Sequence, residues 1–512
     1  MVANLKSSIG AKSTGQPNIT QHPDFERVYN SYRIMRDCYD GEETIKRGGQ
    51  IYLPATQSQI LDGVDTDGSV GNKAYKAYRD RANFPDFLSD AIEIAIGMMH
   101  KKEAVINLPS EMEYLREMAT TEGDSLQTLL MKIHEEQLLM GRTGLFVDIE
   151  DYASVNNMPY LVQHRADCIP NWYQDPILEL VVLDESAPQL REGTISWFSE
   201  LEYRVLTLDR SGSEPVYKQS IHKGAYTYRE EDMITPMYKG RTLDQIPFVF
   251  INIKDTTARV SRSPLQGLAR LCLSIYRSDA DYRQNLHMQG QDTLVVIGGN
   301  VEQEGDAGVR VGAGALLDIE HGGDAKYVGV GSAGLSEQRL AIQTDMDRAR
   351  SKTVQLQGSL TSRDSESAGS RRMRLQSETA NLTQIAEIGA LGLEDALKKI
   401  AKWIGADQSQ VSVTANTEFS DMHFDGQNLV QIITGKRLGA PISWESIHAF
   451  MQEKGLTSLA YAEELMKIGD EVDLVPEIGN VDGVDSQLIV GRRRSDNTGD
   501  PAPSPLDNLT EE

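Results

Sequence analysis

The stretch SPLQGLARLCLSIYRSDADYRQNLHMQ, residues 263–289, decides the fold that the sequence predicts. Ser263 suits the N-cap of a helix, and Pro264 suits its first turn. The pattern then stays helical to about Gln289, roughly 39 Å at 1.5 Å per residue. The sequence therefore predicts one long helix over 264–290.

A second long helix is predicted over 336–357, SEQRLAIQTDMDRARSKTVQLQ, after a strand at 293–299 and a Gly-rich segment of short strands. Its apolar side chains are scattered, and a helix without a wide apolar face buries too little surface within its own chain. Two interpretations stay open. The helix packs against its copies in a ring around a wet channel, or it is one exposed helix with ion pairs of its own. The charged residues are Glu337, Arg339, Asp345, Asp347, Arg348, Arg350 and Lys352.

A third helix is predicted from 371 to 404, about 50 Å long. It follows the loop-like stretch GSLTSRDSESAGS at 358–370. Gly389 and Gly392, near the middle of this helix, fit either a bend or close packing.

The flanking segments indicate an α+β chain. Helical patterns, one of them capped by Asp124 and ended by Gly141, give way after residue 158 to short β-like runs between Gly, Pro, Asp and Ser. A strand region at 405–425 and helices within 426–483 follow. The polar ends, 1–23 and 484–512, predict a flexible arm and a disordered tail.

The composition predicts a soluble chain. Hydrophobic residues make up 39% of it, enough to form buried hydrophobic cores. No apolar run approaches the roughly 20 residues that a helix needs to span a bilayer. Cys38, Cys168 and Cys272 lie far apart and form no CxxC pair. We therefore expect no disulfide framework, no metal site and no cofactor, and a reducing cytoplasm as the place of synthesis.

The net charge is −25, from 51 basic and 76 acidic side chains. A protein that grips DNA through its phosphates needs clustered Lys and Arg. The acidic balance fits either simple solubility or a surface past which DNA slides without sticking.

Taken in order, the segments from about 24 to 470 resemble the portal (head-to-tail connector) proteins of tailed bacteriophages. The blocks RDCYDGEETIKRGGQIYLP, GDSLQTLL and GRTGLFVD resemble one branch of portal-like phage proteins. The resemblance implies a portal fold. Its parts would be an α/β wing (24–263), a first stem helix (264–290), a β clip (291–335), a second stem helix (336–357), a tunnel loop (358–370), a long kinked wing helix (371–404) with the strand region 405–425, and a helical crown (426–483).

The resemblance also implies a mechanical function and no enzymatic activity. About twelve copies would form a ring at one capsid vertex of the virion, as the conduit for genome packaging and ejection. Expected partners are the major capsid protein, the terminase large subunit, a neck or adaptor protein, and double-stranded DNA bound independently of sequence. Assembly would take place in the bacterial host. The chain has no GxxxxGK[ST] segment, which agrees with ATP hydrolysis by the terminase.

Three groups of residues are candidate contacts under this resemblance. Arg371, Arg372 and Arg374 would touch DNA or pair with acids of a neighbouring copy; pairing is favoured for the first two, because cations at a helix N-terminus need an anionic partner. Tunnel contacts with DNA would come from Ser359, Thr361, Ser362, Arg363, Ser365 and Ser367. Docking of terminase or adaptor on the clip would involve Asn300, Glu302, Glu304, Asp306 and Arg310.

Other functions compete with the portal. One is a neck or capsid-associated protein without a DNA channel. Another is a nucleotide-binding enzyme, because Gly329, Gly331 and Gly334 form a GxGxxG; the polar loop that follows its helix offers no second strand with an acid, which counts against it. Asp421, His423 and Asp425 alternate like metal ligands but lack a fourth, so a solvated face is favoured.

Overall fold

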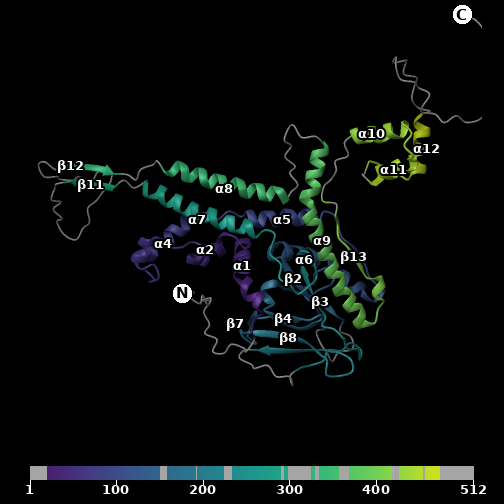
Figure 1. Cartoon of the computed structure of the whole chain (residues 1–512), viewed down its shortest axis with the longest axis horizontal. Helices are drawn as coiled ribbons and strands as arrows, with labels where there is room; N and C mark the ends of the chain where they lie inside the picture. The colour runs from purple at the N-terminus through teal and green to yellow at the C-terminus, as the bar shows by residue number, and fades with distance from the viewer. Residues whose placement is uncertain are drawn as a thin grey trace, which may run out of the picture. The chain divides into compact units, whose positions relative to one another are not determined.

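The computed structural model describes residues 20–149, 158–191, 193–223, 233–289, 293–297, 324–328, 334–356, 368–417, 419, 426–453 and 456–472. The chain divides into two compact units, residues 1–421 and 422–512. Helices and antiparallel sheets share the first unit (Figure 1). The α+β class predicted from the sequence is therefore confirmed.

Helices from the N-terminal part of the chain surround α7 (Gln266–Gln289). The hydroxyl of Tyr78 donates to Asp281 of α7 over 2.6 Å, and the backbone N–H of Asn83 donates to Asp279 over 2.8 Å. Pro85 lies between the fourth and fifth helices of the chain. The helices of this layer are α1 (Pro23–Tyr39), α2 (Glu42–Gly48), α3 (Gln57–Leu61), α4 (Val70–Arg81) and α5 (Phe87–Met99), with a 3-10 turn, η1 (Gly49–Ile51).

The start of α1 is fixed to the sheet region. His22 donates its backbone N–H to the Pro170 carbonyl over 2.9 Å, and its ring stacks on Trp172 with the centroids 4.0 Å apart. Asn171 donates to the Thr20 carbonyl over 2.8 Å. The expectation of a free arm up to residue 23 is wrong from Thr20 onward, because these contacts hold it. Residues 1–19 and 484–512 lie outside the described residues.

The buried helix α6 (Leu126–Met140) runs straight into the first sheet. Its N-cap is Ser125, whose hydroxyl accepts from Thr128 N over 3.1 Å. The prediction of Asp124 as the cap is wrong, because that carboxylate accepts from Lys132 over 2.7 Å instead. Gly141 ends the helix at φ +81, and a Cβ there would lie 2.8 Å from Ser263 N. Glycine is needed here for its backbone conformation and for the close approach of the chain that leads into α7.

The described strands pair antiparallel in small sheets. The first sheet has the order β10 (Phe248–Asn252), β2 (Arg142–Asp148), β3 (Tyr160–Arg165), and all of β2 is buried. The second has the order β4 (Asn171–Gln174), β5 (Leu178–Asp184), β8 (Glu202–Asp209), β9 (Val216–Lys223). The remaining pairs are β1 (Val105–Asn107) with β13 (Ser412–Thr414), β6 (Pro188–Leu190) with β7 (Trp197–Ser199), and β11 (Thr293–Ile297) with β12 (Asp324–Val328); short 3-10 turns lie at η2 (Ser110–Arg116), η3 (Ala166–Cys168) and η6 (Gln408–Gln410).

The long helix α9 (Ala368–Ile404) packs against α6, β2, β10 and β13. It begins three residues earlier than predicted, so residues 368–370 are helical and not part of a loop. A Cβ on Gly389 would lie 2.4 Å from the His134 ring, and one on Gly392 would lie 2.4 Å from Ile251. These glycines serve close packing, one of the two interpretations left open.

The second unit contains α10 (Gly426–Arg437), α11 (Trp444–Glu453) and α12 (Tyr461–Val472). Ile447 and His448 are its buried residues among those described, and the Lys436 ammonium lies 4.3 Å from the Trp444 ring centroid. Among the described helices of either unit, none combines the length and the apolarity that a membrane span requires.

Candidate functional site: the helix pair α7 and α8

The helix α8 (Leu335–Leu356) buries only a narrow stripe of its surface. Ile342, Ala349 and Thr353 are buried where α8 packs on α7 and α5, whereas Leu340 is 58% exposed. A spacing of seven and four residues keeps the buried positions on one side of a helix. The other sides of α8 are open to solvent in the single chain, as the scattered apolar pattern predicted.

The ion pairs formed by α8 lie within the helix. Arg348 pairs with Asp345 over 2.9 Å and Arg350 with Asp347 over 3.0 Å, both at a spacing of three residues. This matches the interpretation of an exposed helix with ion pairs of its own. Exposed pairs of this kind stabilise a helix by only about 0.2–0.5 kcal/mol each. The second interpretation, packing against copies, therefore stays open for the rest of the helix surface.

A polar stripe runs along the outward side of α7. Arg270, Ser274, Arg277 and Asp281 are exposed and recur at spacings of four and three residues. Arg277 donates to the Tyr52 carbonyl over 2.7 Å, which fixes this guanidinium against the η1 turn. Arg270 forms no ion pair with any residue that the structure describes.

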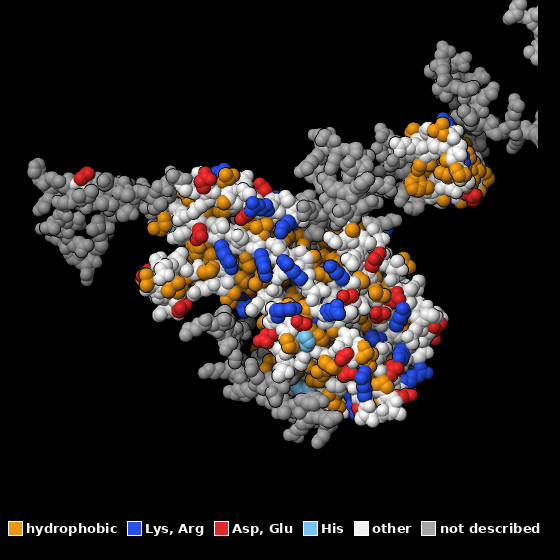
Figure 2. Space-filling model, viewed as in Figure 1, with side chains coloured by type: hydrophobic (Ala, Val, Ile, Leu, Met, Phe, Trp, Pro, Cys, Tyr) orange, Lys and Arg blue, Asp and Glu red, His pale blue; other side chains and the backbone are white. Residues whose placement is uncertain are grey.

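A groove of about 740 Å³ separates the exposed sides of α7 and α8. Arg270 and Ser274 line it from α7; Arg348 and Lys352 line it from α8, together with the single acid Asp347. A Cβ on Gly267 would lie 3.3 Å from the Lys352 ammonium, so the glycine leaves room for that cation. In Figure 2, blue Lys and Arg side chains gather over the region where the two helices pack together.

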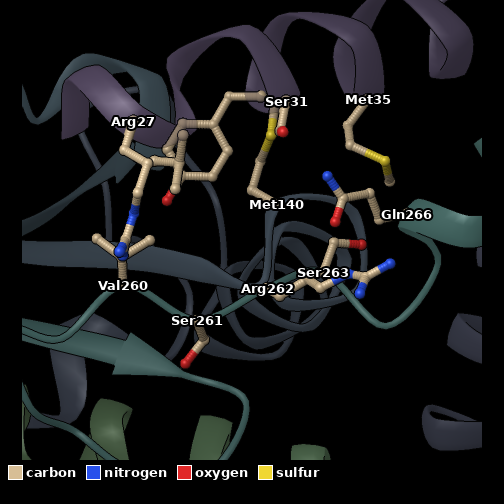
Figure 3. A pocket seen from close by; sticks show the side chains of 11 residues that line it. Arg27, Ser31, Met35, Met140, Val260, Ser261, Arg262, Ser263 and Gln266 are labelled. Atoms are coloured by element: carbon tan, nitrogen blue, oxygen red, sulfur yellow. The ribbon is translucent and has the colours of Figure 1, made fainter. Parts of the chain in front are cut away.

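A smaller cavity of about 210 Å³ lies between α1 and the segment that leads into α7. Figure 3 shows that Arg27 comes from α1 and Arg262 from the segment before α7. Met35 and Met140 also line this cavity. Arg27 pairs with Asp24 over 3.1 Å, whereas Arg262 has no ion-pair partner among the described residues. Exposed cations are therefore found on α7, on the segment before it and on α1.

Most of the residues predicted to contact DNA or partners lie outside the part of the chain that the structure describes. The tunnel-loop residues Ser359–Ser367 and the clip residues Asn300–Arg310 lie outside the described residues. Arg371, Arg372 and Arg374 fall in the first turns of α9. Asp421, His423 and Asp425 also lie outside the described part.

The structure gives no support to the nucleotide-binding alternative. Gly329 and Gly331 fall outside the described residues, but the preceding strand β12 pairs antiparallel with β11. A dinucleotide fold requires a parallel strand at that point. Cys38, Cys168 and Cys272 are free thiols, and no cluster of three potential metal ligands occurs among the residues described.

The basic groove was missed at the level of sequence. Its signal was available, because Arg348 and Lys352 lie four residues apart on one predicted helix and Arg270 lies on the other. The overall surplus of acids concealed it, since net charge carries no information on where cations gather.

A family model described as a domain of unknown function (DUF4055) matches residues 264–404, which contain α7, α8 and α9 and make up less than half of the chain. No curated protein matches the chain. A chain from the neck of a native GTA particle, computed with twelvefold symmetry, is similar at 13% identity and a TM-score of 0.34, covering 71% of this chain and 89% of that chain. A chain from the neck of an empty GTA particle, computed with sixfold symmetry, is similar at 15% identity and a TM-score of 0.35, covering 72% and 90%. Both TM-scores are below 0.5, so neither likeness supports a conclusion on function.

Proposed function

We propose that this chain is a portal subunit, which forms a ring at one capsid vertex of a tailed phage or phage-like particle. One observation carries the proposal: α8 leaves most of its described side chains exposed, although it is 22 residues long and lies beside the 24-residue α7. A ring of copies covers such a surface without demanding a wide apolar face. The order of segments that resembles portal proteins supports the same conclusion.

Within this proposal, α7 and α8 form the stem, and the hairpin β11–β12 belongs to the clip. The segment before Ala368 is the tunnel loop, α9 is the long wing helix, and α10–α12 form the crown. The clip residues Asn300–Arg310 meet the terminase and later the neck or adaptor protein, and the wing meets the capsid protein. The chain performs no catalysis and acts as a conduit for double-stranded DNA.

Native mass spectrometry and negative-stain microscopy of the full chain test the ring directly. We expect a closed assembly of about a dozen copies with a central hole. A monomer or dimer across the tested concentrations and salt conditions would contradict the portal. A closed ring without a central hole would favour the neck or capsid-associated protein.

Deletion of residues 358–367 tests the tunnel loop separately. The deletion stops before α9, which begins at Ala368. We expect rings to form normally while packaging or retention of DNA falls. Unchanged packaging would remove the assignment of this segment as the tunnel loop but would leave the ring intact.

A further inference from the structure

An acidic stripe runs along the outward side of α5. Asp86, Asp90 and Glu93 are exposed at spacings of four and three residues, and none forms an ion pair with a described residue. Partial burial raises the pKa of Asp86, and the charges of Asp90 and Glu42 raise it further. Like charges therefore gather here, and no described cation pairs with Asp86, Asp90 or Glu93.

The acidic stripe and the exposed cations of α7 point in opposite directions. The buried Leu88 of α5 meets α7 at Cys272, whose thiol lies against the backbone of Phe87 and Leu88. Successive residues of a helix are about 100° apart, so a side chain two positions away points to nearly the opposite side. Asp90 therefore points away from α7, and Arg270 points away from α5.

We infer that these two surfaces are the two halves of one contact between copies: the basic face of one subunit docks on the acidic stripe of the next. The basic face consists of Arg262, Arg270, Arg277, Arg348 and Lys352. The inference rests on the ring proposed above and names the contact that closes it. A head-to-tail contact can repeat around a ring because its two patches lie on different sides of the subunit.

A neighbouring copy can supply negative charge to the basic face. Each copy carries a net charge of −25, so copies repel one another unless opposite charges meet locally. The acidic stripe supplies that opposite charge on every copy.

Charge reversal on each surface tests the inference. One variant carries Arg270→Glu, Arg348→Glu and Lys352→Glu, the three cations that line the groove, and so has two acidic surfaces. The other carries Asp90→Lys with Glu93→Lys, and so has two basic surfaces. Alone, each should need a concentration roughly tenfold or more above wild type to assemble, because like charges then face each other. An equimolar mixture should assemble at wild-type concentrations, with the two variants alternating in native mass spectra.

Arg339→Glu is the control, because it reverses an exposed cation of α8 outside the groove. Arg339 is nine positions from Arg348, which places it on the opposite side of the helix. This variant should assemble like wild type. Circular dichroism and the thermal midpoint confirm that each variant is folded before assembly is scored.

The outcomes separate the inference from the proposed function. If the wild-type chain forms no ring, the portal fails. If the wild type forms rings and both reversed variants assemble equally well, the ring stands and the inferred contact is wrong. Folded variants that stay apart even when mixed also overturn the charge pairing. If the Arg270→Glu, Arg348→Glu, Lys352→Glu variant forms rings that no longer retain linear duplex DNA, the basic face is assigned to DNA instead.

Discussion

Gly389 lies where α9 crosses α6, and the space for its missing Cβ is occupied by the His134 ring. That ring is fully buried, and burial lowers the pKa of His134 to about 3. The histidine is therefore neutral near pH 7 and can lie against a helix backbone without an anionic partner. Its Nδ1 lies 2.8 Å from Nε2 of His100. From the sequence alone, Gly389 could be assigned equally to a bend or to packing. Its contact with the His134 ring explains the glycine by packing.

The residue-scale prediction compares two glycines in helices. Gly389→Ala should lower the free energy of unfolding by about 1–3 kcal/mol, because the new methyl group overpacks against His134. Gly97→Ala on α5 meets nothing within 4 Å and should raise it by up to about 1 kcal/mol through helix propensity. Urea denaturation of both variants checks the pair. Equal effects of the two substitutions would contradict the close packing of α9 on α6.

At the scale of elements, helix α8 depends on a few buried side chains. Ile342→Asp should lower the free energy of unfolding by about 2–4 kcal/mol or detach α8, because it places a carboxylate between α8 and its neighbours. Leu340→Asp, on the exposed side of the same helix, should change it by no more than about 0.5 kcal/mol. Limited proteolysis within 335–356 and thermal unfolding measure the difference. Equal sensitivity at both positions would show that α8 is not anchored by this stripe.

The positions of most helices and strands could be predicted, because residues at the ends of the long helices mark where these begin or end. Ser263, Pro264 and Gly141 mark helix ends that the structure reproduces to within a few residues. The start of α9 and the choice of Ser125 over Asp124 could not be predicted, because neighbouring residues offer caps of similar strength. The basic groove could not be predicted, because tertiary packing alone decides which sides of α7 and α8 remain exposed. The tunnel loop and clip stay predictions.

At the scale of the whole molecule, the first unit has a buried core of its own, which extends from Phe25 to Phe419 among the described residues. Deletion of residues 422–512 should therefore leave the main thermal transition within about 2–4 °C of wild type. Differential scanning calorimetry of the full and shortened chains measures this. A larger drop in the midpoint would mean that α10–α12 stabilise the first unit.

The pairing of β1 with β13 has a consequence for synthesis. Val105 pairs with Thr414, about 300 residues later, and α9 covers strands made long before it. At roughly 5–20 residues per second, a ribosome needs about 15–60 s to make the chain between the two strands. During most of that time α9 has not been made and cannot cover α6, β2 and β10. The nascent chain therefore exposes their apolar surface. Completion of the first unit must therefore follow translation of its last strand, which makes the unfinished chain a natural client for chaperones.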